Sequence, residues 1–126
     1  MRAVFDAAAV LAVVFDEPGA EAILANADGS VVSSVNWSEV LQKAAWAGID
    51  AAKVEKQFLR LGVSIVPFDA DQARLAAALW SQTRKRGVSL GDRACLATAM
   101  HLKLPMLTSD SDLSNLGLDV VIHQFR

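Results

Sequence analysis

Four acidic residues stand where a parallel α/β fold would place a catalytic or binding site. Asp6 directly follows an apolar run, Asp110 comes two residues after Thr108, and Glu39 and Asp92 lie in the first turns of predicted helices. Ligands of such sheets bind beyond the carboxyl ends of the strands. Carboxylates gathered there repel one another, and a divalent cation relieves that repulsion. Oxygen ligands favour Mg²⁺ or Mn²⁺ over zinc, and such a site could activate water and neutralise a phosphodiester.

Each acid also has an ordinary structural explanation. Ser89 and Asp92 form a Ser-x-x-Asp sequence, so Asp92 is a candidate helix cap. Asp6 and Asp110 suit the turns that follow strands, and Glu39 suits an exposed helix surface. The shared position of all four acids at one predicted edge is what favours a metal site.

The elements that must position these acids alternate along the chain. Short β-branched or apolar runs predict five strands, at residues 3–5, 30–33, 63–68, 106–108 and 120–123. Helical patterns occupy residues 7–15, 20–27, 35–47, 51–61, 69–86 and 89–102, with a short helix near Leu113. Asp50 and Ser89 are predicted to begin their helices, and Asp69 with Gln72 resembles a capping box. This alternation predicts an α/β fold with a central, mostly parallel five-stranded sheet covered on both faces. We expect one domain over residues 1–126.

The helix that carries Glu39 has two apolar sides. Trp37, Leu41 and Ala44 form the regular stripe, and Glu39 lies nearly opposite it. Val35 and Trp46 share the side of Glu39. We therefore expect a partner, either a second copy or another protein, to cover the region of Trp46.

Composition excludes several classes of protein. Lys+Arg is 12 and Asp+Glu is 14, a net charge of −2, which argues against a protein that coats nucleic acid but not against one that cuts it. The single cysteine, Cys95, excludes an internal disulfide framework and a two-cysteine zinc motif, and the two histidines exclude a His-rich metal site. We expect a cytoplasmic protein with no membrane span, since no apolar run approaches about 20 residues.

Four segments resemble the signature blocks of PIN domains, and more closely those of VapC-type ribonuclease toxins. They are residues 3–12, 36–40, 89–99 and 107–113, in the order of the family. The resemblance spans nearly the whole chain and implies a three-layer α/β/α fold. It further implies a Mg²⁺- or Mn²⁺-dependent endoribonuclease that forms a homodimer and is inhibited by a VapB-like antitoxin.

The resemblance also assigns roles to individual residues. The acidic quartet of the family falls on Asp6, Glu39, Asp92 and Asp110, with Asp6, Asp92 and Asp110 as expected metal ligands. Two auxiliary positions match as well, and they are Thr108 and Asp112. The first block departs from the family pattern, because Ala8 stands where a Ser is usual and a supporting hydrogen bond is lost.

Basic residues near the quartet are candidate RNA contacts. Arg84, Lys85 and Arg86 precede Ser89, and Arg93 follows Asp92. They could bind phosphates, or the first three could complement a helix dipole and Arg93 could pair with an acid.

Two other functions remain to be compared with RNA hydrolysis. Because Ala8 replaces the usual Ser, the alternative is a catalytically impaired PIN-like domain that serves as a protein- or RNA-binding module. A phosphoacceptor receiver domain is disfavoured, because alanines follow Asp6 and no Lys occurs in residues 108–113.

Overall fold

The computed structural model describes residues 1–126 and contains one sheet of five strands, all parallel. The strand order is β3-β2-β1-β4-β5. The strands are β1 (Val4–Phe5), β2 (Val31–Ser33), β3 (Ser64–Val66), β4 (Met106–Thr108) and β5 (Ile122–Gln124). The predicted parallel five-stranded sheet is confirmed, although three of the strands are shorter than the apolar runs that contain them.

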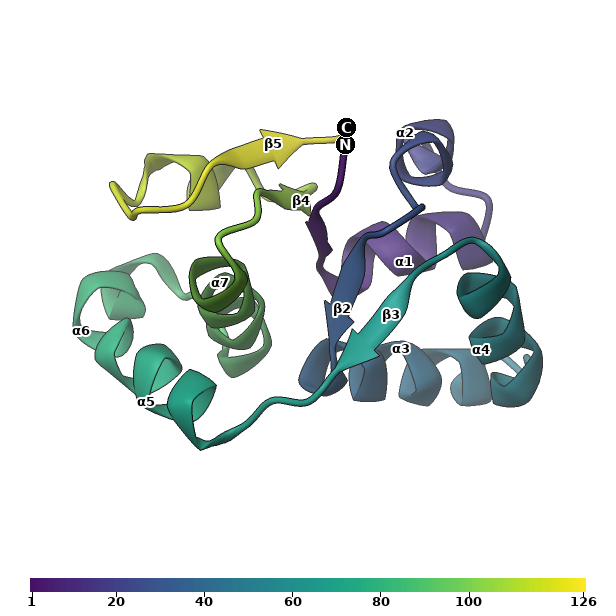
Figure 1. Cartoon of the computed structure of the whole chain (residues 1–126), viewed down its shortest axis with the longest axis horizontal. Helices are drawn as coiled ribbons and strands as arrows, with labels where there is room; N and C mark the ends of the chain where they lie inside the picture. The colour runs from purple at the N-terminus through teal and green to yellow at the C-terminus, as the bar shows by residue number, and fades with distance from the viewer.

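Helices cover both faces of this sheet (Figure 1). On one side are α1 (Ala7–Val14), α2 (Ala20–Ala25), α3 (Ser34–Trp46) and α4 (Ala51–Arg60); on the other are α5 (Ala70–Ala78), α6 (Trp80–Thr83) and α7 (Leu90–Leu102). Two short 3₁₀ helices, η1 (Arg84–Arg86) and η2 (Ser111–Asn115), complete the chain. The three-layer α/β/α architecture is therefore confirmed.

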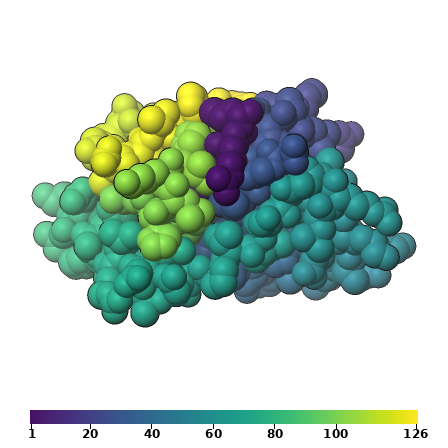
Figure 2. Space-filling view, in the orientation of Figure 1, coloured from purple at the N-terminus to yellow at the C-terminus, as the bar shows by residue number.

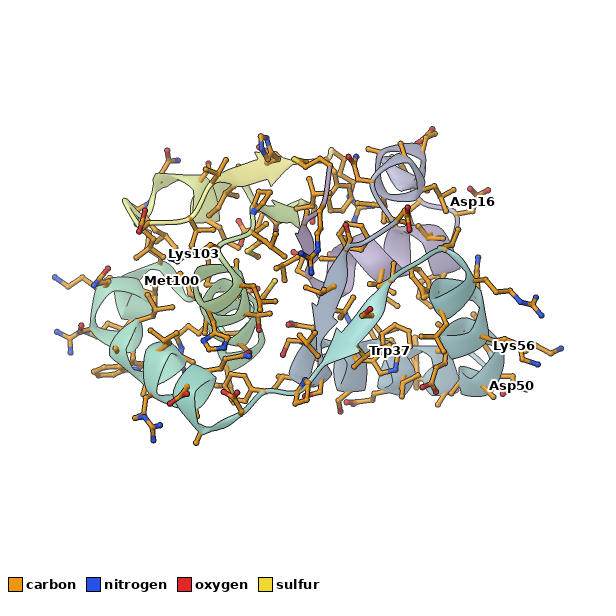
Figure 3. All side chains as sticks on the ribbon, in the orientation of Figure 1. Asp16, Trp37, Asp50, Lys56, Met100 and Lys103 are labelled. Carbon is orange, nitrogen blue, oxygen red and sulfur yellow. The ribbon has the colours of Figure 1, made fainter.

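Side-chain alternation along the strands builds a separate core on each face. Phe5, Val32 and Leu107 point into the core formed with α1, α3 and α4. Their neighbours along the strands, among them Val4 and Met106, enter the second core with α7 and η2. In the larger core Trp37 of α3 packs edge-on against Phe58 of α4, with ring centroids 6.0 Å apart, and Trp37 is labelled in Figure 3.

Strands are added first on one side of β1 and then on the other, so the strand order changes direction at β1. From β1 the chain adds β2 and then β3 on one side, and later returns to place β4 on the other side of β1. Figure 2 shows the result at the surface, where the purple N-terminal segment lies between the blue segment and the yellow-green C-terminal part. The carboxyl ends of β1 and β4 therefore meet at the switch point, which is where sheets of this kind bind ligands.

Side-chain caps set the starts of the main helices. The predicted caps Asp50, Asp69 and Ser89 each accept a backbone hydrogen bond from the first turn of their helix. At Asp69 the predicted capping box is only half formed, because the Gln72 amide instead donates to the Pro67 carbonyl and accepts from Thr98.

The prediction of one continuous helix over residues 69–86 is wrong. The segment is divided at Leu79 into α5 and α6 and then tightens into η1. The Thr83 hydroxyl donates to the Leu79 carbonyl, and such back-bonding bends helices. Gly87, with φ of 65°, ends the segment in the left-handed region. None of the helices has the length and apolar character needed to cross a membrane.

Candidate acidic site at the carboxyl edge of the sheet

Asp6 lies at the end of the central strand and begins the first helix. Its side chain caps α1 by accepting a hydrogen bond from the Ala9 N–H at 2.8 Å. The residue is only 6% exposed, which is rare for a carboxylate with no cationic partner. Asp6 is therefore held rigidly at the switch point between β1 and β4.

The surroundings of Asp6 disfavour its negative charge. Burial raises the pKa of this carboxyl from 3.8 to about 6, although the Thr108 hydroxyl and the Ala9 N–H each lower it. The charges of Asp92 and Glu39 raise it further. The charges of Asp92 and Glu39 thus reach Asp6 across the sheet edge, where the sequence places all three acids.

The same three acids also affect the thiol of Cys95. This thiol is fully buried on α7, and burial raises its pKa well above the ordinary value. Asp6, Asp92 and Glu39 all add to that increase, so their charges converge on the interior side of α7 as well. The two salt bridges of the structure join Arg74 to Asp71 and Arg126 to Glu17, and neither involves the cluster. The three acids thus have no protein counter-ion.

Asp92 takes part in a complete capping box. The Ser89 hydroxyl accepts from the Asp92 N–H at 3.1 Å, and the Asp92 carboxylate accepts from the Ser89 N–H at 3.2 Å. The structural explanation of Asp92 is therefore confirmed. Capping does not remove its charge, which still acts on Asp6.

Glu39 is held against the first turn of α7. The Asn36 side-chain amide donates to Glu39 Oε1 at 3.1 Å and to the Gly91 carbonyl at 2.9 Å. Gly91 makes this approach possible, because a Cβ on it would lie 2.5 Å from Glu39 Oε1. Asn36 and Gly91 are the site residues that the sequence reasoning missed. Asn36 lies three positions before Glu39 and so shares its helix face, which was the available signal.

Asp110 begins a different segment from the other three acids, as the N-cap of η2. Its carboxylate accepts from the Asp112 N–H at 2.9 Å and caps η2, and both residues are exposed. Asp110 is not among the charges that act on Asp6. Thr108, which is fully buried, links the two regions, since its hydroxyl accepts from the Asp110 N–H at 3.1 Å and also stabilises the ionised Asp6.

The donor set of this edge fits a hard divalent cation by charge and atom type. It offers only carboxylate and hydroxyl oxygens, and its negative charges have no cationic partner. As the side chains are placed, no three His, Cys, Asp or Glu residues surround a common point closely enough to hold an ion. Binding of an ion at this edge would thus require side chains to change position.

The basic residues divide into two groups. Arg84, Lys85 and Arg86 are exposed on η1 without salt bridges, and the Arg84 guanidinium lies 5.0 Å from the centre of the Trp80 ring. Arg93 instead donates to the Ala76 carbonyl at 3.0 Å and joins α7 to α5. The first group is available to a ligand, whereas one end of Arg93 is occupied.

Trp46 and the largest cavity both lie outside the acidic cluster. Trp46, the last residue of α3, is 89% exposed, as expected from its position off the apolar stripe. A cavity of about 700 Å³ lies at the other end of α7 from Asp92, with Met100 and Lys103 in its lining (Figure 3). None of the four acids lines this cavity.

Several solved structures share this fold. A toxin–antitoxin complex from Klebsiella pneumoniae contains a chain 23% identical to this one, with a TM-score of 0.70 and coverage of 94% of this chain and 95% of that chain. FitAcB from Neisseria gonorrhoeae gives 22% identity, a TM-score of 0.72 and coverage of 97% and 96%. DNA-bound VapBC from Salmonella typhimurium gives 14% identity, a TM-score of 0.75 and coverage of 100% and 99%.

Comparison at the level of sequence families gives a more specific result. A search of curated proteins found no match. The family model of the PIN domain, however, matches residues 3–118, which is most of the chain and includes all four acids. This chain therefore belongs to the PIN domain family.

Proposed function

We propose that this protein is a metal-dependent endoribonuclease, the toxin of a toxin–antitoxin pair, with residues 1–126 acting as one PIN domain. The observation that carries the proposal is the PIN fold with a buried Asp6 at its switch point and Glu39 packed against Gly91, beside Asp92, with no counter-ion for these acids. Like charges persist together in a protein when a bound cation stabilises them.

The residues of the chain would divide the work of hydrolysis among them. Asp6, Asp92 and Asp110 would hold Mg²⁺ or Mn²⁺, and Thr108 and Asp112 would support them. The metal would supply charge neutralisation at the phosphodiester and activation of the attacking water. Glu39 would orient that water, since it is fixed by the Asn36 amide. No protein nucleophile is required.

Substrate binding is proposed for the exposed cations of η1. Arg84, Lys85 and Arg86 follow α6 and precede the capping residue of α7, so they flank the helix that carries Asp92. Phosphate contacts there would place RNA across the sheet edge. Arg93 could add a contact only with the part of its guanidinium that Ala76 does not use.

Partner proteins are proposed from the neighbours and from Trp46. The structural neighbours named above include toxin–antitoxin and VapBC complexes, which supports a VapB-like antitoxin as inhibitor. An 89% exposed tryptophan favours burial against a partner, and we assign that role to a second copy of the chain or to the antitoxin. The pair would act in the cytoplasm, where its RNA substrates are.

One comparison tests the proposal. Purified wild type and Asp6→Asn are incubated with a pool of cellular RNAs in Mn²⁺ and in EDTA. We expect cleavage by the wild type to require the metal and the variant to be slower by about a hundredfold or more, the scale for removing one key electrostatic group. Equal cleavage by both would identify a contaminant or another site. No cleavage under any metal condition would favour the impaired binding module, which Ala8 keeps as the second candidate.

A further inference from the structure

Asn36 is a buried amide with an unusual set of neighbours. It is 2% exposed, and both atoms facing its side-chain nitrogen are acceptors, Glu39 Oε1 at 3.1 Å and the Gly91 carbonyl at 2.9 Å. A reversed amide would set its oxygen against those two oxygens, so the orientation of the side chain follows from the chemistry. Both N–H groups of Asn36 therefore point at residues of the acidic site.

The other end of this amide is unsatisfied. Asn36 Oδ1 is buried and has no hydrogen-bond partner, a property it shares only with Arg93 Nε among buried side-chain atoms. An unpaired buried oxygen costs folding free energy, so an amide is a poor choice here for stability alone. An apolar side chain of the same shape would avoid the unpaired oxygen but could not donate the two hydrogen bonds to Glu39 and Gly91.

We propose that Asn36 is a positioning residue that clamps the Glu39 carboxylate to the first turn of α7, beside Asp92. The inference rests on the proposed function for its effect on RNA cleavage, but the clamp itself is a property of the fold. Gly91 forms the opposite wall, since a Cβ there would lie 2.5 Å from Glu39 Oε1. Glu39 is thus fixed between a donor on its own helix and the backbone of the helix that carries Asp92.

The first test needs neither RNA nor metal. The chain has three asparagines, so the Asn36 side-chain signals in an ¹H–¹⁵N spectrum are readily assigned. We expect the Asn36 amide protons to exchange with solvent at least about tenfold more slowly than those of exposed Asn115. Glu39→Ala should shift the Asn36 signals and speed their exchange, whereas Glu55→Ala, an exposed carboxylate on α4, should leave them unchanged. If Glu39→Ala leaves the chemical shifts and exchange rates of the Asn36 amide unchanged, the proposal that Asn36 holds Glu39 is wrong.

The second test separates positioning from stability. Asn36→Leu removes both the donors and the unpaired oxygen, and Asn36→Asp keeps the shape but replaces the donors with a repelling charge. We expect each to lower kcat at least about tenfold with an unchanged KM for RNA, as for residues that orient a site, and Asn36→Leu to keep the wild-type Tm. Wild-type kcat in both variants would overturn the proposal.

A matched control and an independent variant complete the design. Gln72 is an equally buried amide, but it bonds Pro67 and Thr98, so Gln72→Leu should lower Tm and leave kcat unchanged. Gly91→Ala should lower kcat by displacing Glu39 while Tm stays level or rises, because Ala is the better helix former. Full kcat in Gly91→Ala would count against the clamp. If the wild type cleaves no RNA with Mn²⁺, the proposed function fails, and the spectroscopic result alone decides whether Asn36 holds Glu39.

Discussion

Replacing Asp6 with Asn should stabilise the metal-free protein at neutral pH, although it removes a residue of the proposed site. The pKa of Asp6 is raised from 3.8 to about 6 in the folded state, chiefly by burial. Between these two values the folded protein binds a proton that the unfolded chain has released. The free energy of unfolding therefore falls as the pH rises from about 4 to about 6, and the loss is complete above that range.

The size of the effect follows from the shift. One pKa unit corresponds to about 1.4 kcal/mol, so a shift of about two units costs about 3 kcal/mol at pH 7. Asn has no charge to bury, and its Oδ1 can still accept from the Ala9 N–H, a cap of comparable strength. We expect Asp6→Asn to be more stable than wild type by up to about 3 kcal/mol at pH 7, and the two proteins to differ by less than about 1 kcal/mol at pH 3.

Urea denaturation in EDTA at several pH values measures this difference directly. Addition of Mn²⁺ should then close most of the gap, because a ligand at 100 times its Kd adds about 2.7 kcal/mol to the protein that binds it. Asp119→Asn, at an exposed carboxylate outside the site, should follow the wild type throughout.

Two results would refute this reasoning. If Asp6→Asn is no more stable than wild type at pH 7 without metal, the buried carboxylate does not carry the cost assigned to it. If Mn²⁺ stabilises both proteins equally, the ion is bound away from Asp6.

Three further predictions concern the helix cap, the exposed tryptophan and the basic segment. Ser89→Ala should lower the free energy of unfolding by about 1 kcal/mol in urea titrations, because it removes half of the capping box, and an unchanged midpoint would contradict the cap. Trp46→Arg should give a folded monomer in sedimentation, or lose antitoxin binding, whereas a monomeric wild type with unaltered antitoxin affinity would exclude this interface. Arg84→Ala should weaken binding to single-stranded RNA modestly at low salt and lower the slope of log Kd against log salt by about 0.7, the value for one phosphate contact; an unchanged slope would remove Arg84 from the RNA path.

The alternation of strands and helices was predictable because each element has a strong local signal. Asp50, Asp69 and Ser89 cap the helices that their sequences predict, and the apolar runs give all five strands. Strand ends were less predictable, since an apolar run continues past the last ladder hydrogen bond. The third strand ends at Val66, directly before Pro67, which has no N–H to donate. The division at Leu79 coincides with hydrogen bonds from the Thr83 hydroxyl to the Leu79 and Trp80 carbonyls, which composition does not reveal.

The places of the acids in the fold were predictable from their positions along the chain, whereas their side-chain partners were not. Asp6 follows the central strand, and Glu39 and Asp92 lie in the opening turns of neighbouring helices, so their charges meet. The contact of Asn36 with Gly91 joins residues far apart in the chain, and no local pattern marks it. Asp110 is predicted to join the other acids, and its carboxylate also caps η2 by accepting from the Asp112 N–H, a partner that the strand pattern does not indicate.

The strand order has a consequence for when the protein can become active during its synthesis. β1 is translated before β2 and β3, yet its neighbour β4 follows both of them along the chain. Contacts between such distant segments form late, because the entropy cost of closing a long loop must be met before the contacts stabilise the fold. A nascent chain therefore holds Asp6 without Thr108 until β4 has been translated, and the sheet edge between them can form only after that. Under the proposed function, RNA cleavage would therefore begin only after β4 has joined β1 in the sheet.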